Sequence, residues 1–186
     1  MATQAVFLDK DGTIVEDFPY NADLQKIKLL DDVIPGLKKL ALAGFGLVVV
    51  TNQSGVARGY FREIDVRQVG RHLEKIFKHN GVPLMDFYYC PHHPEALAPE
   101  YKAICSCPKP AEGMLLQAKF EHNIDLARSW FIGDILNDIE SGRRAGCRTV
   151  LIDNGQETQW QENPLRKPHA MVANFKEAVD VILRWA

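Results

Sequence analysis

The sequence predicts an α/β fold in which a mostly parallel sheet carries helices on both faces. Short apolar runs alternate with segments of helical periodicity along the 186 residues. The apolar runs are continuous, which is typical of strands buried on both faces of a parallel sheet. The length suits one well-packed domain, so we expect residues 1–186 to form a single three-layer unit.

Five strands and five helices are expected in alternation. The strands are Ala5–Leu8, Gly46–Val50, Asp86–Tyr89, Trp130–Ile132 and Thr149–Ile152, and the helices are Asp32–Ala43, Arg62–His79, Ala111–His122, Asn137–Ala145 and Phe175–Trp185. Asp31 or Asp32 can cap the first helix and Gly44 can end it, and Gly81 with Pro83 ends the second. Irregular stretches remain at residues 16–30, 91–110 and 154–169.

Composition and charge exclude several classes of protein. Hydrophobic residues make up 46% of the chain and charged residues 25%, and the net charge is −2 with no block of like charges. A nucleic-acid partner is therefore not indicated. The N-terminus has no basic region before its first apolar run, and the longest apolar stretch, near residues 47–50, is too short to span a bilayer. We expect a cytoplasmic monomer that acts on a small molecule and has no membrane partner.

Two acids follow the first predicted strand, in the run Ala5-Val6-Phe7-Leu8-Asp9-Lys10-Asp11-Gly12-Thr13. Open α/β sheets bind ligands at the carboxyl ends of their strands. Asp9 and Asp11 stand about one pleat repeat apart, close enough to share a divalent cation and a phosphoryl group. One carboxylate can attack phosphorus while the other handles the leaving-group proton. The alternative is that Asp-Gly only makes a turn.

Three further features of the sequence could supply the other groups that this chemistry requires. The second strand ends in Thr51-Asn52-Gln53-Ser54-Gly55, whose hydroxyl, amide and backbone N–H groups suit phosphate oxygens, although a plain loop is an alternative. Asp134 and Asp138 follow the fourth strand and can complete an oxygen-rich Mg²⁺ shell, or they can serve helix capping and the helix dipole. Lys109 can hold phosphoryl charge, or it can be an ordinary solvated lysine.

A Cys₃His set lies in the irregular stretch at residues 91–110 and the strand end before it. Cys90, His92, Cys105 and Cys107 supply the donors of a closed tetrahedral Zn²⁺ site. Because four protein ligands leave no open position, this zinc would be structural and would stiffen the long loop. His93 adjoins His92, so the choice of imidazole stays open, and free surface thiols are the alternative.

These motifs, in this order, resemble the haloacid dehalogenase (HAD) superfamily of aspartate-nucleophile phosphatases. The resemblance spans nearly the whole chain and implies a three-layer Rossmann-like HAD fold with an inserted zinc loop and no large cap domain. It implies that Asp9 is the nucleophile and that Asp11 is the general acid and base. Thr51 and Lys109 take the phosphoryl-stabilising positions, and Asp9, the Asp11 carbonyl and Asp134 bind Mg²⁺.

The zinc loop narrows this resemblance to the heptose bisphosphate phosphatase family, with the histidinol-phosphate phosphatase domain also similar. The expected reaction is Mg²⁺-dependent hydrolysis of the C7 phosphate of a heptose 1,7-bisphosphate, on the way to nucleotide-activated heptose. The substrate-facing positions that this implies are Asp17, Tyr20, Asn52, Gln53, Ser54 and Arg58.

The chain departs from that family at several positions. Pro108 stands where the family usually has a phosphate-recognising arginine, Phe18-Pro19 alters the flap, and Ile135 replaces a lysine of some relatives. The alternatives are a phosphatase for histidinol phosphate or another small phosphomonoester, and a non-catalytic zinc-bearing interaction module.

Overall fold

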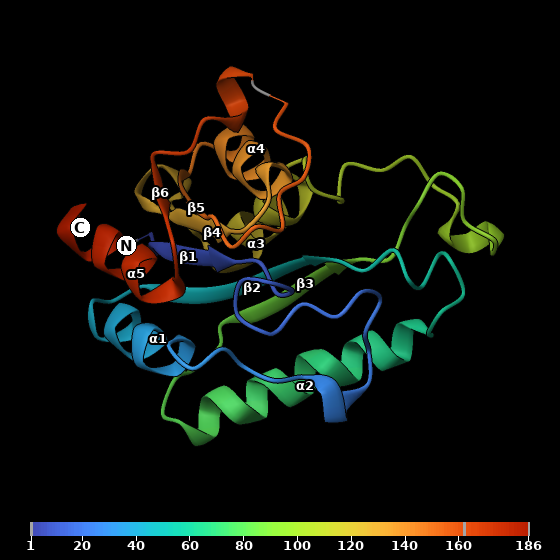
Figure 1. Cartoon of the computed structure of the whole chain (residues 1–186), viewed down its shortest axis with the longest axis horizontal. Coiled ribbons are helices and arrows are strands. Elements are labelled where there is room, and N and C mark those ends of the chain that lie inside the picture. The colour runs from blue at the N-terminus through green and yellow to red at the C-terminus, as the bar shows by residue number, and fades with distance from the viewer. Residues whose placement is uncertain (1, 162, 186) are drawn as a thin grey trace.

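The computed structural model describes residues 2–161 and 163–185, which fold around a six-stranded sheet (Figure 1). The strands are β1 (Ala5–Leu8), β2 (Gly46–Asn52), β3 (Asp86–Cys90), β4 (Trp130–Gly133), β5 (Arg148–Ile152) and β6 (Ala170–Val172). All neighbouring strands are parallel, in the order β3-β2-β1-β4-β5-β6. The predicted α/β class is confirmed.

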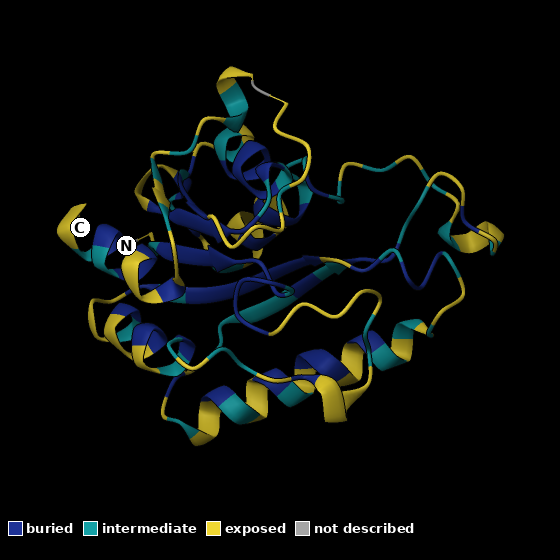
Figure 2. Cartoon of the chain, in the orientation of Figure 1, coloured by how far each residue is buried: buried dark blue, intermediate teal, exposed yellow. Residues whose placement is uncertain are grey.

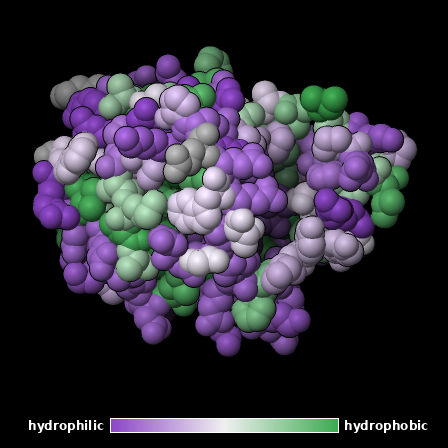
Figure 3. Space-filling model, turned by 45° about the horizontal axis from the view of Figure 1, so that its top comes forward, coloured by the Kyte–Doolittle hydropathy of each residue, from purple (hydrophilic) through white to green (hydrophobic). Residues whose placement is uncertain are grey.

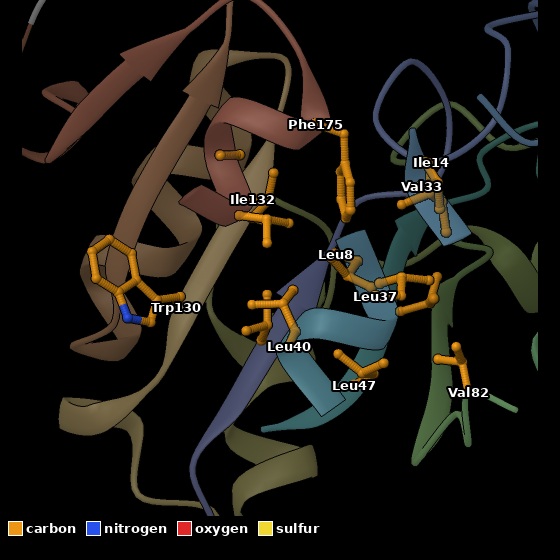
Figure 4. Close-up of a cluster of buried hydrophobic side chains, with 14 of the residues drawn as sticks. Leu8, Ile14, Val33, Leu37, Leu40, Leu47, Val82, Trp130, Ile132 and Phe175 are labelled. Atoms are coloured by element: carbon orange, nitrogen blue, oxygen red, sulfur yellow. The ribbon is translucent and has the colours of Figure 1, made fainter. Parts of the chain in front are cut away.

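Among the described residues, five α-helices cover the two faces of the sheet. They are α1 (Val33–Leu42), α2 (Glu63–His79), α3 (Gly113–His122), α4 (Leu136–Ala145) and α5 (Phe175–Trp185). Side chains of α1, α2 and α5 pack on one face, in the core that Figure 4 shows, and those of α3 and α4 pack on the other. Successive β1 residues enter opposite cores, Leu8 one and Phe7 the other, which explains why the strands are apolar without alternation. The central strands are coloured as buried in Figure 2.

Strand β6 was not predicted. It has three residues at the edge of the sheet, pairs only with β5, and is half-buried to exposed along its length. Its residues belong to the apolar run at residues 170–173, which is only four residues long and directly follows the polar stretch at residues 154–169. A run this short does not distinguish a strand from a loop. The other elements lie within a few residues of their predicted bounds.

The Asp32 side chain, which was expected to cap α1, accepts its hydrogen bond from another helix. Asp32 occupies the N-cap position, but its side chain makes no capping hydrogen bond to α1. Its Oδ2 instead accepts a hydrogen bond from the backbone N–H of Lys176 at 2.8 Å, so it satisfies a donor in the first turn of α5. Gly44 follows the end of α1 with a φ of +86°, as predicted for a helix-terminating glycine.

The strand order places a crevice beside β1. The chain runs outward from β1 through β2 to β3, and then returns to the other side of β1 for β4. Ligands of open α/β sheets bind where the order reverses in this way, at the carboxyl ends of the strands. The N–H of Asp9 bonds the Ile132 carbonyl at 3.0 Å, so the residues that leave β1 lie beside those that leave β4.

Two irregular segments lie at this edge of the sheet. The flap, residues 16–30, contains a short 3₁₀ turn, η1 (Leu24–Lys26), and the zinc loop, residues 91–110, contains η2 (Pro99–Tyr101). Figure 1 shows the zinc loop beyond the strand ends at the right of the molecule. No large cap domain covers the edge within the described residues, as predicted. No helix in residues 2–161 and 163–185 is long and apolar enough to cross a membrane.

Candidate functional site

A buried lysine joins two acids at the carboxyl ends of the central strands. The Lys109 ammonium contacts Asp9 Oδ1 and lies 2.7 Å from Asp138 Oδ1. Burial alone would lower the lysine pKa, but the Asp138 and Asp9 carboxylates outweigh that effect and raise it. Lys109 is therefore a fixed cation and not the solvated lysine that the sequence left as an alternative.

Three carboxylates meet around this lysine. Oxygens of Asp9, Asp134 and Asp138 all lie within 4.8 Å of one another. Burial, followed by the charges of Asp9 and Asp138, raises the pKa of Asp134, and burial raises that of Asp138 in spite of the opposing charge on Lys109. One ammonium cannot balance three carboxylates, and an all-oxygen, acid-rich set is what Mg²⁺ prefers. The donor set therefore fits a divalent cation.

The two acids after β4 have different surroundings. Asp138 Oδ2 accepts the backbone N–H groups of Asp134 and Ile135 at 3.2 Å, and its other oxygen faces Lys109. A Cβ on Gly133 would lie 2.3 Å from the Asp138 Cβ, so only glycine allows this packing. Asp138 thus caps α4 and pairs with the lysine, whereas Asp134, which the sequence offered as a possible cap, turns toward Asp9.

Asp134 is held from the loops on either side. Thr13 Oγ1 and Asn154 Nδ2 each lie 3.3 Å from one of its oxygens, and Asn154 Nδ2 also donates to the Gly12 carbonyl at 2.8 Å. Gly12 has a φ of +76°, and a Cβ there would overlap Asp134 Oδ2. Sequence reasoning missed Asn154 because an asparagine in a polar loop carries no distinguishing signal.

Asp11 lies in a separate polar network. Its Oδ1 contacts the ammonium of Lys10, which is 1% exposed, and its Oδ2 accepts from Gln53 Nε2 at 3.2 Å. Gln53 Nε2 also donates to Thr51 Oγ1 at 2.9 Å, so one amide links the loop after β1 to the end of β2. Burial raises the pKa of Asp11 in spite of the opposing charge on Lys10. A raised pKa is what a carboxyl group needs in order to donate a proton. Lys10 had not been singled out from the sequence.

Asn52 contacts the chain at Lys109. Its Nδ2 donates to the Lys109 carbonyl and its Oδ1 accepts the Lys109 N–H, both at 2.9 Å. This two-point clamp uses both ends of the amide. The sequence placed Asn52 among substrate-facing residues, and the structure places its amide on the backbone of the lysine.

The other predicted substrate-facing residues lie in the loops around this edge. Asp17 and Tyr20 are exposed on the flap, with Tyr20 at a φ of +51°. Ser54 and Arg58 belong to the loop after β2, where the Arg58 N–H donates to the Ser54 carbonyl at 3.0 Å. In Figure 3 the surface is hollowed between the main body and the lobe at the right, where Figure 1 places the zinc loop.

The predicted Cys₃His set also comes together. One ligand atom from each of Cys90, His92, Cys105 and Cys107 lies within 4.8 Å of the others, with His92 Nδ1 3.4 Å from both Cys105 and Cys107 Sγ. His93 points elsewhere, because its Nδ1 accepts the Glu95 N–H at 3.1 Å. The geometry favours His92 over His93 as the imidazole of this cluster.

The surroundings of Cys105 and Cys107 disfavour their thiolate forms when no cation is bound. Hydrogen bonding to Cys90 and burial raise the pKa of Cys107, and burial raises that of Cys105. A divalent metal that prefers soft ligands would lower these thiol pKa values by binding the thiolates. Three sulfur donors with one nitrogen donor match zinc. Cys147 is buried elsewhere in the core and takes no part in the cluster.

The cluster lies on the same loop as Lys109. Cys107 precedes the lysine by two residues, and the Gly113 N–H bonds the Ser106 carbonyl at 2.9 Å. The far end of the loop is tied to α2 because Tyr101 Oη donates to Glu63 Oε2 at 3.1 Å.

Comparisons with known proteins agree with this geometry. A family model described as HAD-hydrolase-like matches residues 106–178. The D-glycero-β-D-manno-heptose-1,7-bisphosphate 7-phosphatase of Yersinia pestis is 38% identical over 182 residues, spanning 92% of this chain and 97% of the relative. The protein of the same name from Photorhabdus laumondii is 43% identical over 153 residues, spanning 82% and 81%.

A solved structure shows the same fold. The D,D-heptose 1,7-bisphosphate phosphatase from B. bronchiseptica, complexed with magnesium and phosphate, superposes with a TM-score of 0.84. The match covers 99% of this chain and 100% of that one at 24% sequence identity.

Proposed function

Because this chain belongs to the HAD-like hydrolases, in the group of the D-glycero-β-D-manno-heptose-1,7-bisphosphate 7-phosphatases, we propose that it removes the C7 phosphate from that heptose bisphosphate. The chain is a phosphoric monoester hydrolase. The observation that carries the proposal is the buried Asp9–Lys109–Asp138 array, which lies next to Asp134 and Asp11 at the switch point of the sheet.

The first step is in-line attack by Asp9. A carboxylate oxygen of Asp9 forms a bond to phosphorus as the bond from phosphorus to the C7 oxygen breaks, which gives an aspartyl phosphate. Asp11 donates its proton to the departing sugar oxygen, and its raised pKa favours the protonated form that this requires. The sugar leaves as a neutral alcohol.

The second step releases phosphate. Asp11, now a carboxylate, accepts a proton from water as the water oxygen attacks phosphorus, and the bond to Asp9 breaks. Asp9 returns to a carboxylate and inorganic phosphate departs. In both steps the Lys109 ammonium and the Thr51 hydroxyl would stabilise the charge on the phosphoryl oxygens. Asp138 and Asn52 hold Lys109 in place.

Two metals complete the proposed enzyme. Asp9, Asp134 and the Asp11 carbonyl would hold Mg²⁺, which supplies charge neutralisation for the phosphoryl group when bound. Cys90, His92, Cys105 and Cys107 would hold a structural Zn²⁺ that stiffens the loop leading into Lys109. Asp138 is left out of the Mg²⁺ set because backbone N–H groups and Lys109 use both of its oxygens.

A substrate panel tests the proposed function. The panel contains the α- and β-anomers of D-glycero-D-manno-heptose 1,7-bisphosphate, mannose phosphates and histidinol phosphate. We expect one of the two heptose anomers to have the highest kcat/KM. Release of phosphate from C7 and not C1 is expected for the preferred anomer, as followed by ³¹P NMR. A kcat/KM for histidinol phosphate that exceeds the values for both heptose anomers would contradict the proposal.

The clamp on Lys109 predicts a specific kinetic defect. Asn52→Ala frees the lysine backbone without removing its charge, so kcat and kcat/KM should fall together by about ten- to a hundredfold. Steady-state kinetics on the preferred ester measures this. A rise in KM with unchanged kcat would instead assign Asn52 to substrate binding.

The cluster assignment predicts which variants lose zinc. After dialysis against mild EDTA, the protein should retain one zinc per chain while its Mg²⁺-dependent turnover stops until Mg²⁺ is restored. Cys105→Ser should lose this zinc, as measured by inductively coupled plasma mass spectrometry. His93→Asn and Cys147→Ser are the matched controls and should retain it. Retention by Cys105→Ser, or loss by Cys147→Ser, would show that the ligands are different.

A further inference from the structure

Three loops meet at the guanidinium of Arg58. Arg58 lies in the loop after β2, and its guanidinium carbon is 5.9 Å from the centre of the Tyr20 ring on the flap. Its Nη2 is 3.2 Å from Nε2 of His93 on the zinc loop. The loop after β2 is also fixed to the zinc loop, because the Leu97 N–H donates to the Ala57 carbonyl at 2.9 Å. Arg58 therefore contacts all three segments that border this edge of the sheet.

The contact between Arg58 and His93 brings two donors together. His93 Nδ1 accepts the Glu95 N–H, so in the neutral imidazole the proton resides on Nε2. A guanidinium has no acceptor atom. The Nε2–H of His93 and the Nη2–H of Arg58 thus face each other at 3.2 Å, and neither can accept a hydrogen bond from the other.

A third donor at this place also lacks an acceptor. Arg58 Nε is buried and has no hydrogen-bond partner among the described residues. No ion pair within 4.0 Å in that part of the chain includes Arg58, so its charge is not neutralised by a carboxylate. Buried donors and charges are normally paired, and a group of unmatched donors around one cation is the arrangement of an anion site.

The aromatic residues beside Arg58 hold the cation without neutralising it. Tyr20 lies against the guanidinium and also packs on Tyr60, with the ring centres 4.7 Å apart. A cation over an aromatic face keeps its full charge for a ligand.

The donors around Arg58 lie on the same loops as the reacting groups. The loop that carries Arg58 begins at Gln53, whose amide bonds Asp11, and the flap that carries Tyr20 begins a few residues after Asp11. An anion held at Arg58 therefore lies on the loops that surround the Asp9 and Asp11 carboxylates.

We propose that Arg58 and His93 form an anion subsite for the second phosphate of the substrate, the one that is not hydrolysed. This inference rests on the proposed function, since it requires a bisphosphate as substrate. Arg58 Nη2 and Nε with His93 Nε2 offer three donors to phosphate oxygens, two of them from a planar guanidinium. Pro108, directly before Lys109, supplies neither charge nor an N–H for this purpose.

The test compares two esters of one sugar. Arg58→Gln should lower kcat/KM for heptose 1,7-bisphosphate about ten- to a hundredfold more than for heptose 7-phosphate, because only the bisphosphate loses a charge-assisted contact. Turnover of the 7-phosphate also reports that the variant is folded. Arg58→Lys should give a smaller loss of discrimination, since it keeps the charge and loses the planar fork. Arg71→Gln, on the exposed side of α2, is the matched control and should change neither ester.

Equal losses for both esters would overturn the proposal and leave Arg58 as a tether between loops, and unchanged kinetics for both would also overturn it. If neither heptose ester is hydrolysed, the proposed function fails by itself. The subsite is then tested with fructose 1,6-bisphosphate against fructose 6-phosphate, where the same difference between esters is expected.

Discussion

The buried ammonium of Lys109 is the constraint on which the site depends. A lysine that is 5% exposed persists as a cation only when carboxylates are placed against it, and here Asp9 and Asp138 supply them. The three residues come from the end of β1, from the zinc loop and from the first turn of α4. Removing one partner of such a buried pair typically costs about 3–5 kcal/mol. The lysine thus ties the sheet, the loop and the helix together at the place where phosphoryl transfer is proposed.

The rest of the site holds this lysine in position. Asn52, the last residue of β2, fixes the Lys109 backbone with two hydrogen bonds. The Cys₃His cluster begins at the end of β3 and finishes two residues before the lysine. A long irregular loop buries little apolar surface and is therefore weakly stabilised by the core. Ligands from the loop to one metal ion would order it instead. In this account the proposed zinc would affect the chemistry only through the placement of Lys109.

The sequence predicted the parts of the molecule that local patterns encode. Continuous apolar strands follow from burial on both faces, and Asp9 and Asp134 could be placed at strand ends because each directly follows an apolar run. What the sequence could not predict depends on contacts between distant residues. Strand β6 has only three residues, half-buried to exposed, and the short apolar run that contains it does not by itself indicate a strand. The clamp by Asn52, the buried position of Lys10 and the contact between Asn154 and Asp134 each need the tertiary fold. The contact between Arg58 and His93 is of the same kind, because it brings together two loops that pack on each other only in the folded chain.

The most direct test of this account is to trap the covalent intermediate. The enzyme is quenched with acid during turnover of its preferred ester with Mg²⁺ and reduced with sodium borohydride, which converts an aspartyl phosphate to homoserine. Peptide mass spectrometry then locates the modified residue. Homoserine at position 9, formed only when substrate is present, is the result that this account predicts. Homoserine at another aspartate, or none in enzyme that releases phosphate with burst kinetics, would contradict it.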